Sequence, residues 1–314
     1  MTEMRFGALL VIALALPAVS GGATGEWKRG VPLPQARGEV AAAVAEGRIY
    51  IIGGFTSGGA NSTTVQAFNP PTNSWAQEAD LPLPVDHTMA AGYRGRVYVA
   101  GGYGPGRARL TTLFAFTGDG WTRLASMPEQ RAAGGAAIVN GKLYVVGGTT
   151  GSTIGAPTTL AKTMLVYDIA RDRWTSRRGP TPREHLGVTA LSGKIYAVAG
   201  RTGGFDTNMR VVEVFNPRTG RWSQLPRVPG KRGGTGAAGT GRWIVSAGGE
   251  ATSGTIRTVY RYDVKRRRWS KLPNLPTARH GLGVAAVGGK VYVIGGGTSP
   301  GLSVSRANES LAVR

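Results

Sequence analysis

The pattern of apolar and polar residues repeats along this chain. Residues 279–297 show the unit: a basic residue, a strand of alternating small and apolar residues, a glycine turn with one cation, a second apolar strand and a glycine pair. The pair recurs as Gly53-Gly54, Gly101-Gly102, Gly147-Gly148, Ala199-Gly200, Gly248-Gly249 and Gly295-Gly296. Short strands and glycine turns repeating about every 50 residues predict a ring of β-sheet blades rather than a helical solenoid.

A tryptophan keeps the same period as the glycine pair, usually shortly before a Leu-Pro or Met-Pro step. The series is Trp27, Trp75, Trp121, Trp174, Trp222 and Trp269. Glycine makes up 50 of the 314 residues, which suits a protein of many turns, and no sustained apolar pattern of period 3.6 occurs in the repeats. We therefore predict an all-β, six-bladed β-propeller with four antiparallel strands, a to d, in each blade.

The repeats define six blades in a single domain from residue 24 to residue 314. Their expected bounds are about 38–82, 86–128, 132–178, 184–226, 233–273 and 280–314 plus 26–34. The last repeat ends after its third strand (308–314), whereas the strand at 26–34 carries the Trp and Leu-Pro of a fourth strand. We expect the N-terminal strand to complete the last blade, because closure removes exposed sheet edges.

The first 23 residues have the layout of a secretory signal peptide: a short polar head, a mostly apolar run at 6–19 and then small residues. Cleavage after about Ser20 or Ala23 would export the protein to the periplasm or the extracellular space. The alternative is an uncleaved anchor, but the run is shorter than a membrane span requires. The chain has no cysteine, which excludes a lipoprotein anchor and disulfides.

The combination of Arg, small-residue strand, Gly-[Lys/Arg]-x-Tyr, Gly-Gly, a Val-x-x-[Tyr/Phe]-[Asp/Asn] strand and Trp-x-x-Leu-Pro resembles the kelch repeat. The resemblance covers all six repeats and implies an exported six-bladed kelch propeller. Kelch propellers include protein-binding modules, a copper oxidase and sugar mutarotases, so the resemblance is specific for fold and not for function. The copper oxidase needs a Cys–Tyr cofactor, which a chain without cysteine cannot form.

Candidate binding residues gather where the innermost strand of each blade begins. Five repeats have an arginine there and the second has Val85; the arginines are Arg37, Arg131, Arg183, Arg232 and Arg279. Neighbouring positions vary and include Glu39, Asp86, His87, Glu184, His185 and His280. The d–a and b–c connections emerge on one face of the ring, here called the loop face, with the long loops 149–164, 201–210 and 297–308. We expect these residues to form a ligand site in the channel mouth, although the arginines could instead tie neighbouring blades together through backbone carbonyls or a carboxylate.

The opposite face, formed by the a–b and c–d turns and here called the turn face, is predicted to be basic. One turn position is cationic in every repeat, and the fifth repeat adds a basic run; these residues are Arg48, Arg96, Lys142, Lys194, Arg242, Lys290, Lys265, Arg266, Arg267 and Arg268. With a net charge of +21, attraction to anionic lipid or acidic polysaccharide is possible. We expect no nucleic-acid partner, because the chain is predicted to be exported and has no recognised nucleic-acid module.

The sequence favours a monomeric binding module whose mouth takes a partner protein or an anionic or carbohydrate ligand. An alternative is a carbohydrate mutarotase or epimerase with Glu184, His185, Asp86 and His87 as acid/base groups. A second alternative is a basic surface protein that attaches to acidic polysaccharide or anionic lipid. Neither a metal site nor a cofactor is predicted, because no histidine pair has metal-ligand spacing.

Overall fold

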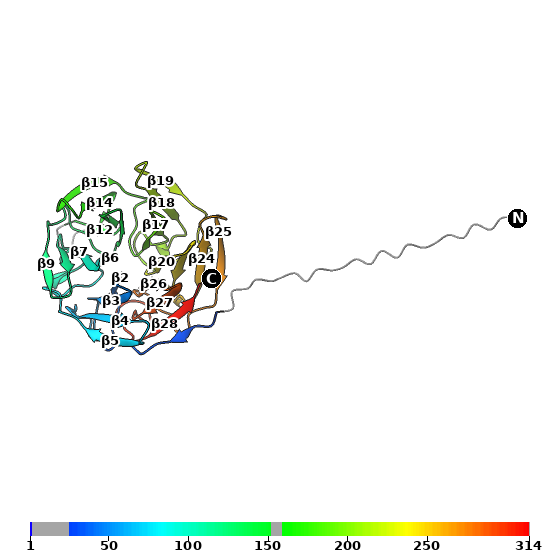
Figure 1. Cartoon of the computed structure of the whole chain (residues 1–314), viewed down its shortest axis with the longest axis horizontal. Helices are drawn as coiled ribbons and strands as arrows, with labels where there is room; N and C mark the ends of the chain where they lie inside the picture. The colour runs from blue at the N-terminus through cyan, green and yellow to red at the C-terminus, as the bar shows by residue number, and fades with distance from the viewer. Residues whose placement is uncertain (2–24, 152–158, 314) are drawn as a thin grey trace.

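The computed structural model describes residue 1, residues 25–151 and residues 159–313. Six four-stranded antiparallel sheets stand around a central axis, as the prediction required (Figure 1). The predicted signal peptide at 1–23 lies outside the described residues, apart from Met1. Within the described part of the chain, no helix is both long and apolar enough to cross a membrane.

The first three blades follow each other along the chain, and each runs from the axis outward. Blade 1 contains β2 (Ala41–Ala45), β3 (Arg48–Ile52), β4 (Val65–Asn69) and β5 (Ser74–Gln77). Blade 2 contains β6 (Met89–Tyr93), β7 (Arg96–Ala100), β8 (Leu113–Phe116) and β9 (Trp121–Arg123). Blade 3 contains β10 (Gly135–Val139), β11 (Lys142–Val146), β14 (Thr163–Asp168) and β15 (Arg173–Arg178).

The last three blades complete the ring. Blade 4 contains β16 (Gly187–Leu191), β17 (Lys194–Val198), β18 (Val212–Asn216) and β19 (Arg221–Gln224). Blade 5 contains β20 (Gly236–Thr240), β21 (Trp243–Ala247), β24 (Val259–Asp263) and β25 (Arg268–Leu272). Blade 6 contains β26 (Gly283–Val287), β27 (Lys290–Ile294), β28 (Asn308–Ala312) and β1 (Lys28–Arg29).

Four b–c loops contain short elements of their own. These are the 3₁₀ turns η1 (Pro105–Arg107) and η2 (Phe205–Thr207), and the two-stranded ribbons β12 (Thr149–Thr150) with β13 (Thr159–Leu160) and β22 (Glu250–Ala251) with β23 (Gly254–Thr255). These short elements add structure on the loop face, and none of them is a strand of a four-stranded blade sheet.

The N-terminal strand closes the ring. In β1, Lys28 pairs with Ser310 of β28 and Arg29 pairs with Glu309 (Figure 1). Leu33, just after β1, is completely buried and belongs to a cluster shared by blades 6 and 1. The prediction that the last blade borrows its outer strand is confirmed.

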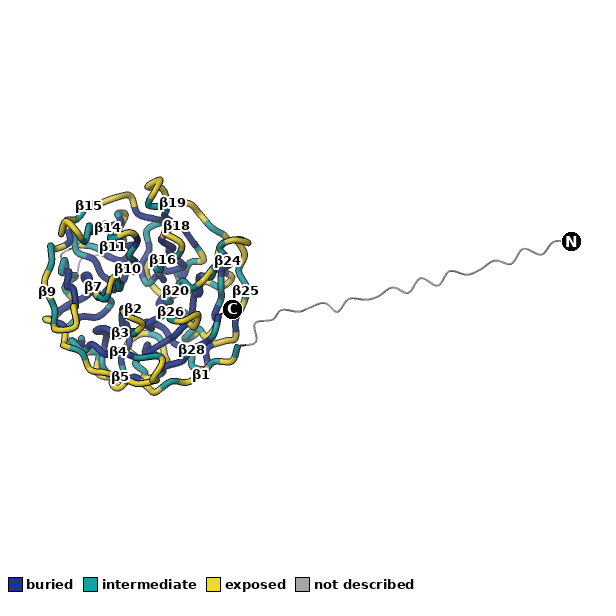
Figure 2. The backbone as a smooth tube through the Cα atoms, in the orientation of Figure 1, coloured by how far each residue is buried: buried dark blue, intermediate teal, exposed yellow. Residues whose placement is uncertain are grey.

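The hydrophobic core lies between the blades rather than inside each sheet. Six main clusters of buried residues each take their members from two neighbouring blades, whereas much of the outer rim is exposed (Figure 2). Successive side chains of a strand point to opposite faces of the sheet, so each blade directs apolar side chains at both neighbouring blades. A single blade therefore cannot bury its two apolar faces alone.

The repeated tryptophans join the blades at the outer rim. Each indole N–H donates to a carbonyl of the preceding blade; Trp121 donates to Ala79 at 2.8 Å, and Trp75 donates to Val31 of the N-terminal segment at 2.9 Å. In blades 1 to 5 the indole also packs on a Phe or Tyr of its own third strand, with centroids 5.0–5.3 Å apart. The Trp and the aromatic residue of the third strand are therefore structural.

The glycine pairs occur where the next blade approaches most closely. The second glycine donates to the carbonyl of the following blade, as in Gly102 N to Arg131 O at 2.8 Å. A Cβ on Gly101, whose φ is 57°, would lie 2.2 Å from the same oxygen. Close backbone contact and a left-handed backbone therefore favour glycine at both positions, although blade 4 has Ala199 at the first position with a φ of 55°.

We predict that a chain beginning at residue 35 is less stable throughout the ring than one beginning at residue 25. Removal of residues 25–34 exposes the buried surface around Leu33, which lowers the free energy of unfolding by about 1.5–3 kcal/mol. It also leaves the edge of β28 without a paired strand. The melting temperature should fall by about 5 °C or more in one cooperative transition. Equal melting temperatures for the two chains would contradict this closure role.

Candidate functional site

The five repeated arginines, called here the ring arginines, are completely buried. Arg37 shows the pattern: its guanidinium donates to the carbonyls of Gly53 at 2.8 Å and Thr64 at 2.7 Å, and to the Gln66 side chain at 2.9 Å. It thereby ties the start of the blade to the ends of its second and third strands. Burial lowers the pKa of Arg37 to about 10, against the attraction of Asp80, so the group is charged at neutral pH.

Three ring arginines also pair with a carboxylate of their own blade. Arg183 lies 2.5 Å from Glu213, and Arg279 lies 2.6 Å from Glu309; Arg131 pairs with Glu129 at 2.5 Å. Arg232 instead donates to Thr258 and lies 5.0 Å from the Tyr260 ring centroid.

This placement corrects the expectation that Arg37, Arg131, Arg183, Arg232 and Arg279 contact a ligand. All five have 0 % exposed surface, so none offers a free donor to a bound molecule. Their hydrogen bonds instead hold the ends of the strands around the mouth in place.

The residue after each ring position forms an isolated β-bridge to the residue that follows the glycine pair. Glu184 bridges Arg201 in blade 4, and Asp86 bridges Tyr103 in blade 2. Blade 5 places Glu250 by the same bridge, and blade 6 places His280. Two residues per blade are thus held rigidly at the mouth, whatever their side chains are.

The next residue has a left-handed backbone in every blade. The six are Glu39, His87, Ala133, His185, Gly234 and Gly281, with φ between 49° and 64°. Their backbones join into a closed hydrogen-bonded circle, in which His87 N donates to Glu39 O at 3.1 Å and each later blade repeats the contact until Val40 N reaches Gly281 O. A left-handed non-glycine residue costs on the order of 1–3 kcal/mol. Polar side chains in these positions are therefore held at some expense of stability.

Three of these residues, Glu39, His87 and His185, line a cavity of about 500 Å³ on the loop face. Its floor includes Glu39, His87 and His185, and below it the channel narrows to a neck of about 140 Å³ lined by the innermost strands. Its rim includes aromatic residues and Leu302, which is 71 % exposed. The predicted mouth is therefore a real cavity; residues 152–158 of the loop 149–164 lie outside the described part of the chain.

Seven side chains form a closed circuit across this mouth, called here the mouth network. Its successive contacts are Glu39–His87 at 3.3 Å, His87–His185 at 3.0 Å, His185–Glu184 at 3.2 Å, Glu184–Arg201 at 3.1 Å, Arg201–Glu250 at 2.7 Å, Glu250–His280 at 3.3 Å and His280–Glu39 at 3.0 Å. Asp86 hydrogen-bonds to His87 from outside the circuit and is held in turn by Arg107 at 2.9 Å.

The charges of the mouth network perturb its pKa values. Burial alone would raise the pKa of Glu39, but attraction by His87 and the other two histidines holds it well below its usual range. For Glu184, His185 and Arg201 overcome the effect of burial and lower the pKa to about 2. Burial opposes the charged form of His87 and His280, yet their carboxylate neighbours raise the pKa of both.

The mouth lacks the large positive excess of the whole protein. Its four carboxylates, on Glu39, Asp86, Glu184 and Glu250, face two arginines, Arg107 and Arg201, and two histidines with raised pKa values, His87 and His280, in a chain with a net charge of +21. This balance does not favour an anionic ligand. The low pKa of Glu184 also makes it a poor general acid at neutral pH, so the geometry gives no specific support to a mutarotase.

Sequence reasoning missed Phe55, Tyr103, Arg107, Arg201 and Glu250 as mouth residues. Four of them share a signal that was available, because they directly follow the glycine pair. The residue after the glycine pair differs from blade to blade, although the pair before it recurs. The six residues are Phe55, Tyr103, Thr149, Arg201, Glu250 and Gly297.

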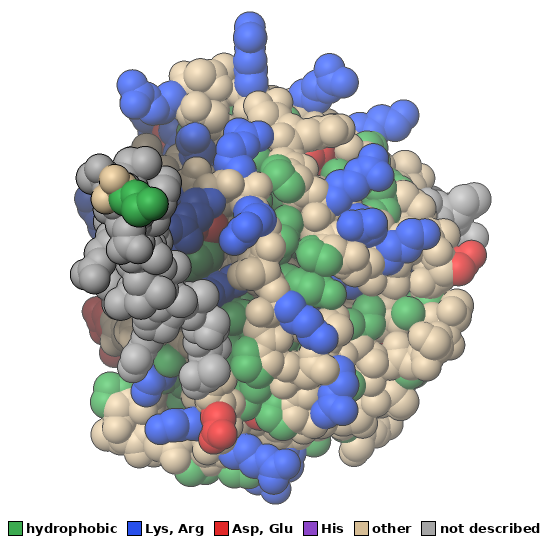
Figure 3. All heavy atoms as spheres, turned by 90° about the vertical axis from the view of Figure 1, so that its right-hand side faces the viewer, with side chains coloured by type: hydrophobic (Ala, Val, Ile, Leu, Met, Phe, Trp, Pro, Cys, Tyr) green, Lys and Arg blue, Asp and Glu red, His purple; other side chains and the backbone are tan. Residues whose placement is uncertain are grey.

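On the turn face, half of the repeated cations are paired within their own blade. Arg48 lies 2.5 Å from Glu78, Lys142 lies 2.5 Å from Asp168, and Arg242 lies 3.3 Å from Asp263. Arg96, Lys194, Lys290 and the run Lys265, Arg266, Arg267 and Arg268 are exposed. Figure 3 looks at the outer side of the ring and not at the turn face, and there too lysine and arginine side chains are spread with few acidic side chains between them.

Comparison with known proteins agrees with the repeat geometry. The chain matches the family described as "KLHDC2/KLHL20/DRC7 Kelch-repeats domain" over residues 23–178 and 164–296. It is therefore a six-bladed propeller of the kelch-repeat family, and the predicted resemblance is confirmed.

Individual relatives share part of this chain. It is 30 % identical over 246 residues to the Kelch-like protein terF of Aspergillus terreus, which covers 76 % of this chain and 44 % of that protein. It is 31 % identical over 121 residues to the human Kelch repeat and BTB domain-containing protein 12, covering 35 % of this chain and 19 % of the relative. The chain thus spans less than half the length of these relatives.

We predict that Arg183→Met destabilises the protein by about 3–5 kcal/mol, because Glu213 would be left buried without its cation. Adding Glu213→Gln should recover much of this loss by removing the unpaired charge. Urea unfolding of wild type, both single variants and the double variant measures the coupling. Strictly additive effects would contradict a charge-coupled pair.

Proposed function

We propose that this protein is an interaction module that binds a partner protein on the loop face, over the channel mouth. Kelch-repeat propellers are typically protein-interaction modules, and this chain belongs to that family. The observation that carries the proposal is the cavity of about 500 Å³ with an apolar and aromatic rim above a charged floor. A concave site of this size on a rigid scaffold suits an inserted side chain or a short segment.

The rim supplies apolar contact area. Leu302, from the b–c loop of blade 6, is exposed and leans toward blade 1, where a side chain on Gly59 would come within 3.3 Å of its Cδ1. Phe55 and Tyr103 line the same cavity but are buried, and the Arg107 guanidinium lies over both rings at 5.5 and 4.1 Å, so Leu302 and Arg107 are the exposed contact groups. Aromatic residues and arginine are the types enriched in protein interfaces.

The floor supplies charge selectivity. The mouth has four carboxylates beside two guanidinium groups and three imidazoles, so it lacks the positive excess of the rest of the protein and can accept a basic group. We infer that the partner presents a segment with an apolar residue and a basic group, the first for the rim and the second for the carboxylates.

We expect a photo-crosslinking residue at position 302 to capture the partner in the native host, whereas the same residue at Lys194 on the turn face should not. With the purified partner, Leu302→Asp and Arg107→Ala should each weaken binding about tenfold or more, as hot-spot residues do. Lys194→Ala is the matched control and should bind as wild type. Equal capture from both faces, or unchanged affinity of both mouth variants, would overturn the proposal.

We also propose that the protein meets its partner outside the cytoplasm, in keeping with the signal-peptide layout of residues 1–23. The intact mass of protein from the native host should correspond to a chain that begins after Ser20 or Ala23. A chain that retains residues 1–23 and fractionates with the cytoplasm would contradict this localisation.

A further inference from the structure

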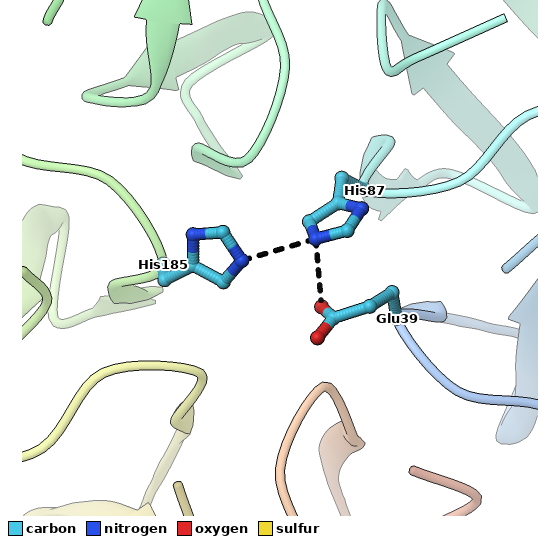
Figure 4. A group of neighbouring side chains, drawn as sticks. All are labelled: Glu39, His87 and His185. Atoms are coloured by element: carbon cyan, nitrogen blue, oxygen red, sulfur yellow. Dashed lines mark hydrogen bonds and ion pairs between the residues drawn. The ribbon is translucent and has the colours of Figure 1, made fainter. Parts of the chain in front are cut away.

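Three residues of the left-handed circle project long polar side chains to one point on the channel axis. Glu39, His87 and His185 come from blades 1, 2 and 4, with φ values of 49°, 50° and 52° (Figure 4). The equivalent residue is Ala133 in blade 3 and glycine in blades 5 and 6. A small residue would satisfy the backbone at all six positions, so the fold alone does not explain these three side chains. Strained polar residues of this kind gather at functional sites.

The three side chains direct lone-pair-bearing atoms at one another. His87 Nε2 lies 3.0 Å from His185 Nε2 and 3.3 Å from Glu39 Oε2 (Figure 4). The far nitrogen of each imidazole faces a carboxylate: Asp86 hydrogen-bonds to His87 Nδ1, and Glu184 lies 3.2 Å from His185 Nδ1.

A carboxylate beside each Nδ1 favours the tautomer of both histidines in which Nδ1 carries the hydrogen. A neutral imidazole that directs Nδ1–H at a carboxylate keeps its lone pair on Nε2. In this tautomer two imidazole lone pairs and one carboxylate oxygen face the same point. A hydrogen on one of the two Nε2 atoms relieves the repulsion between them, and a metal ion held by all three atoms does so as well.

The donor set matches a first-row transition metal. Two imidazole nitrogens and one glutamate oxygen are a common ligand set for Zn²⁺, whereas Ca²⁺ and Mg²⁺ prefer oxygen ligands alone. Tetrahedral Zn–N bonds of about 2.0–2.1 Å place two nitrogens roughly 3.3 Å apart, close to the 3.0 Å found here. Carboxylates behind both imidazoles are the usual partners of metal-bound histidine.

A second group of possible ligands, Glu39, Glu250 and His280, lies alongside. His280 is a poor ligand, because Nδ1 lies 3.0 Å from Glu39 and Nε2 lies 3.0 Å from the Ser299 carbonyl. Each nitrogen faces an acceptor and so carries a hydrogen. His280 instead holds the second oxygen of Glu39, which orients the first toward His87.

We propose that Glu39, His87 and His185 form a site for a divalent transition-metal ion, with Zn²⁺ as its probe. The fourth coordination position would face the mouth cavity, which all three residues line. This inference goes against the expectation from sequence that the protein has no metal site. The partner's basic group is proposed to reach the same floor, but the two proposals are tested separately, because the partner-binding variants Leu302→Asp and Arg107→Ala lie on the rim and not among the three ligands.

The test uses the full chain without a histidine tag, stripped of metal by a chelator and titrated with Zn²⁺ near neutral pH. We expect one ion to bind per chain and to raise the melting temperature. Co²⁺ should give the visible absorption of a four-coordinate site, and X-ray absorption should report nitrogen and oxygen ligands. All three histidines of the chain lie in the mouth network, so no histidine elsewhere competes.

His185→Ala should weaken Zn²⁺ binding by roughly 100-fold or more without loss of the fold, because Ala133 occupies the same left-handed position in blade 3. Glu184→Gln keeps all three ligands and should weaken binding about 10–100-fold. Gly281→Ala should also weaken it, since a Cβ there would lie 2.4 Å from the Glu39 carboxyl carbon. Lys194→Ala, on the turn face, is the matched control and should bind as wild type.

The absence of stoichiometric Zn²⁺ binding below millimolar concentration would overturn the proposal. So would equal affinity of wild type, His185→Ala and Glu184→Gln. Loss of binding in His280→Ala with normal binding in His185→Ala would also overturn it, in favour of the neighbouring group.

Discussion

A guanidinium group without exposed surface must find a hydrogen-bond acceptor inside the protein, and this requirement organises five of the six repeats, the second having Val85 at this position. Arg37 meets it by binding the carbonyls at the ends of the second and third strands. Its own carbonyl accepts from Gly296 of the preceding blade, so the same residue also fixes the distance between blades. The two residues that follow it then have defined places: residue 38 in a bridge and residue 39 in the left-handed circle.

This frame makes the mouth independent of the side chains that occupy it. Bridge and circle are backbone structures, and they hold glycine, alanine, glutamate or histidine in the same register. A variable set of side chains can therefore gather on one axis without disturbing the blades. The mouth network is one such set, and it gathers three glutamates in one place within a basic protein.

The rim and the floor of the mouth differ in exposure and hence in chemistry. Leu302 and Arg107 are open to solvent and can meet a macromolecule, whereas Glu39 and Glu250 are buried in ion pairs. Membership of the kelch-repeat family supports the proposal that the rim binds a partner. The floor has a different explanation, since histidines backed by carboxylates are groups poised to hold a cation.

The sequence by itself determined the number of blades, their strand order, the closure by residues 26–34 and the face on which each loop emerges. It could do so because the apolar–polar alternation, the turn residues and the repeat length are local properties of the sequence, and each of the six copies shows them. Only the tertiary structure decided what the repeated residues touch. Closure of the ring brings His87 to His185 across 98 positions and His280 to Glu39 across 241, separations that no local pattern encodes. For the same reason the ring arginines, expected as ligand contacts, proved to be buried supports, because burial depends on the neighbouring strands and not on the residue itself.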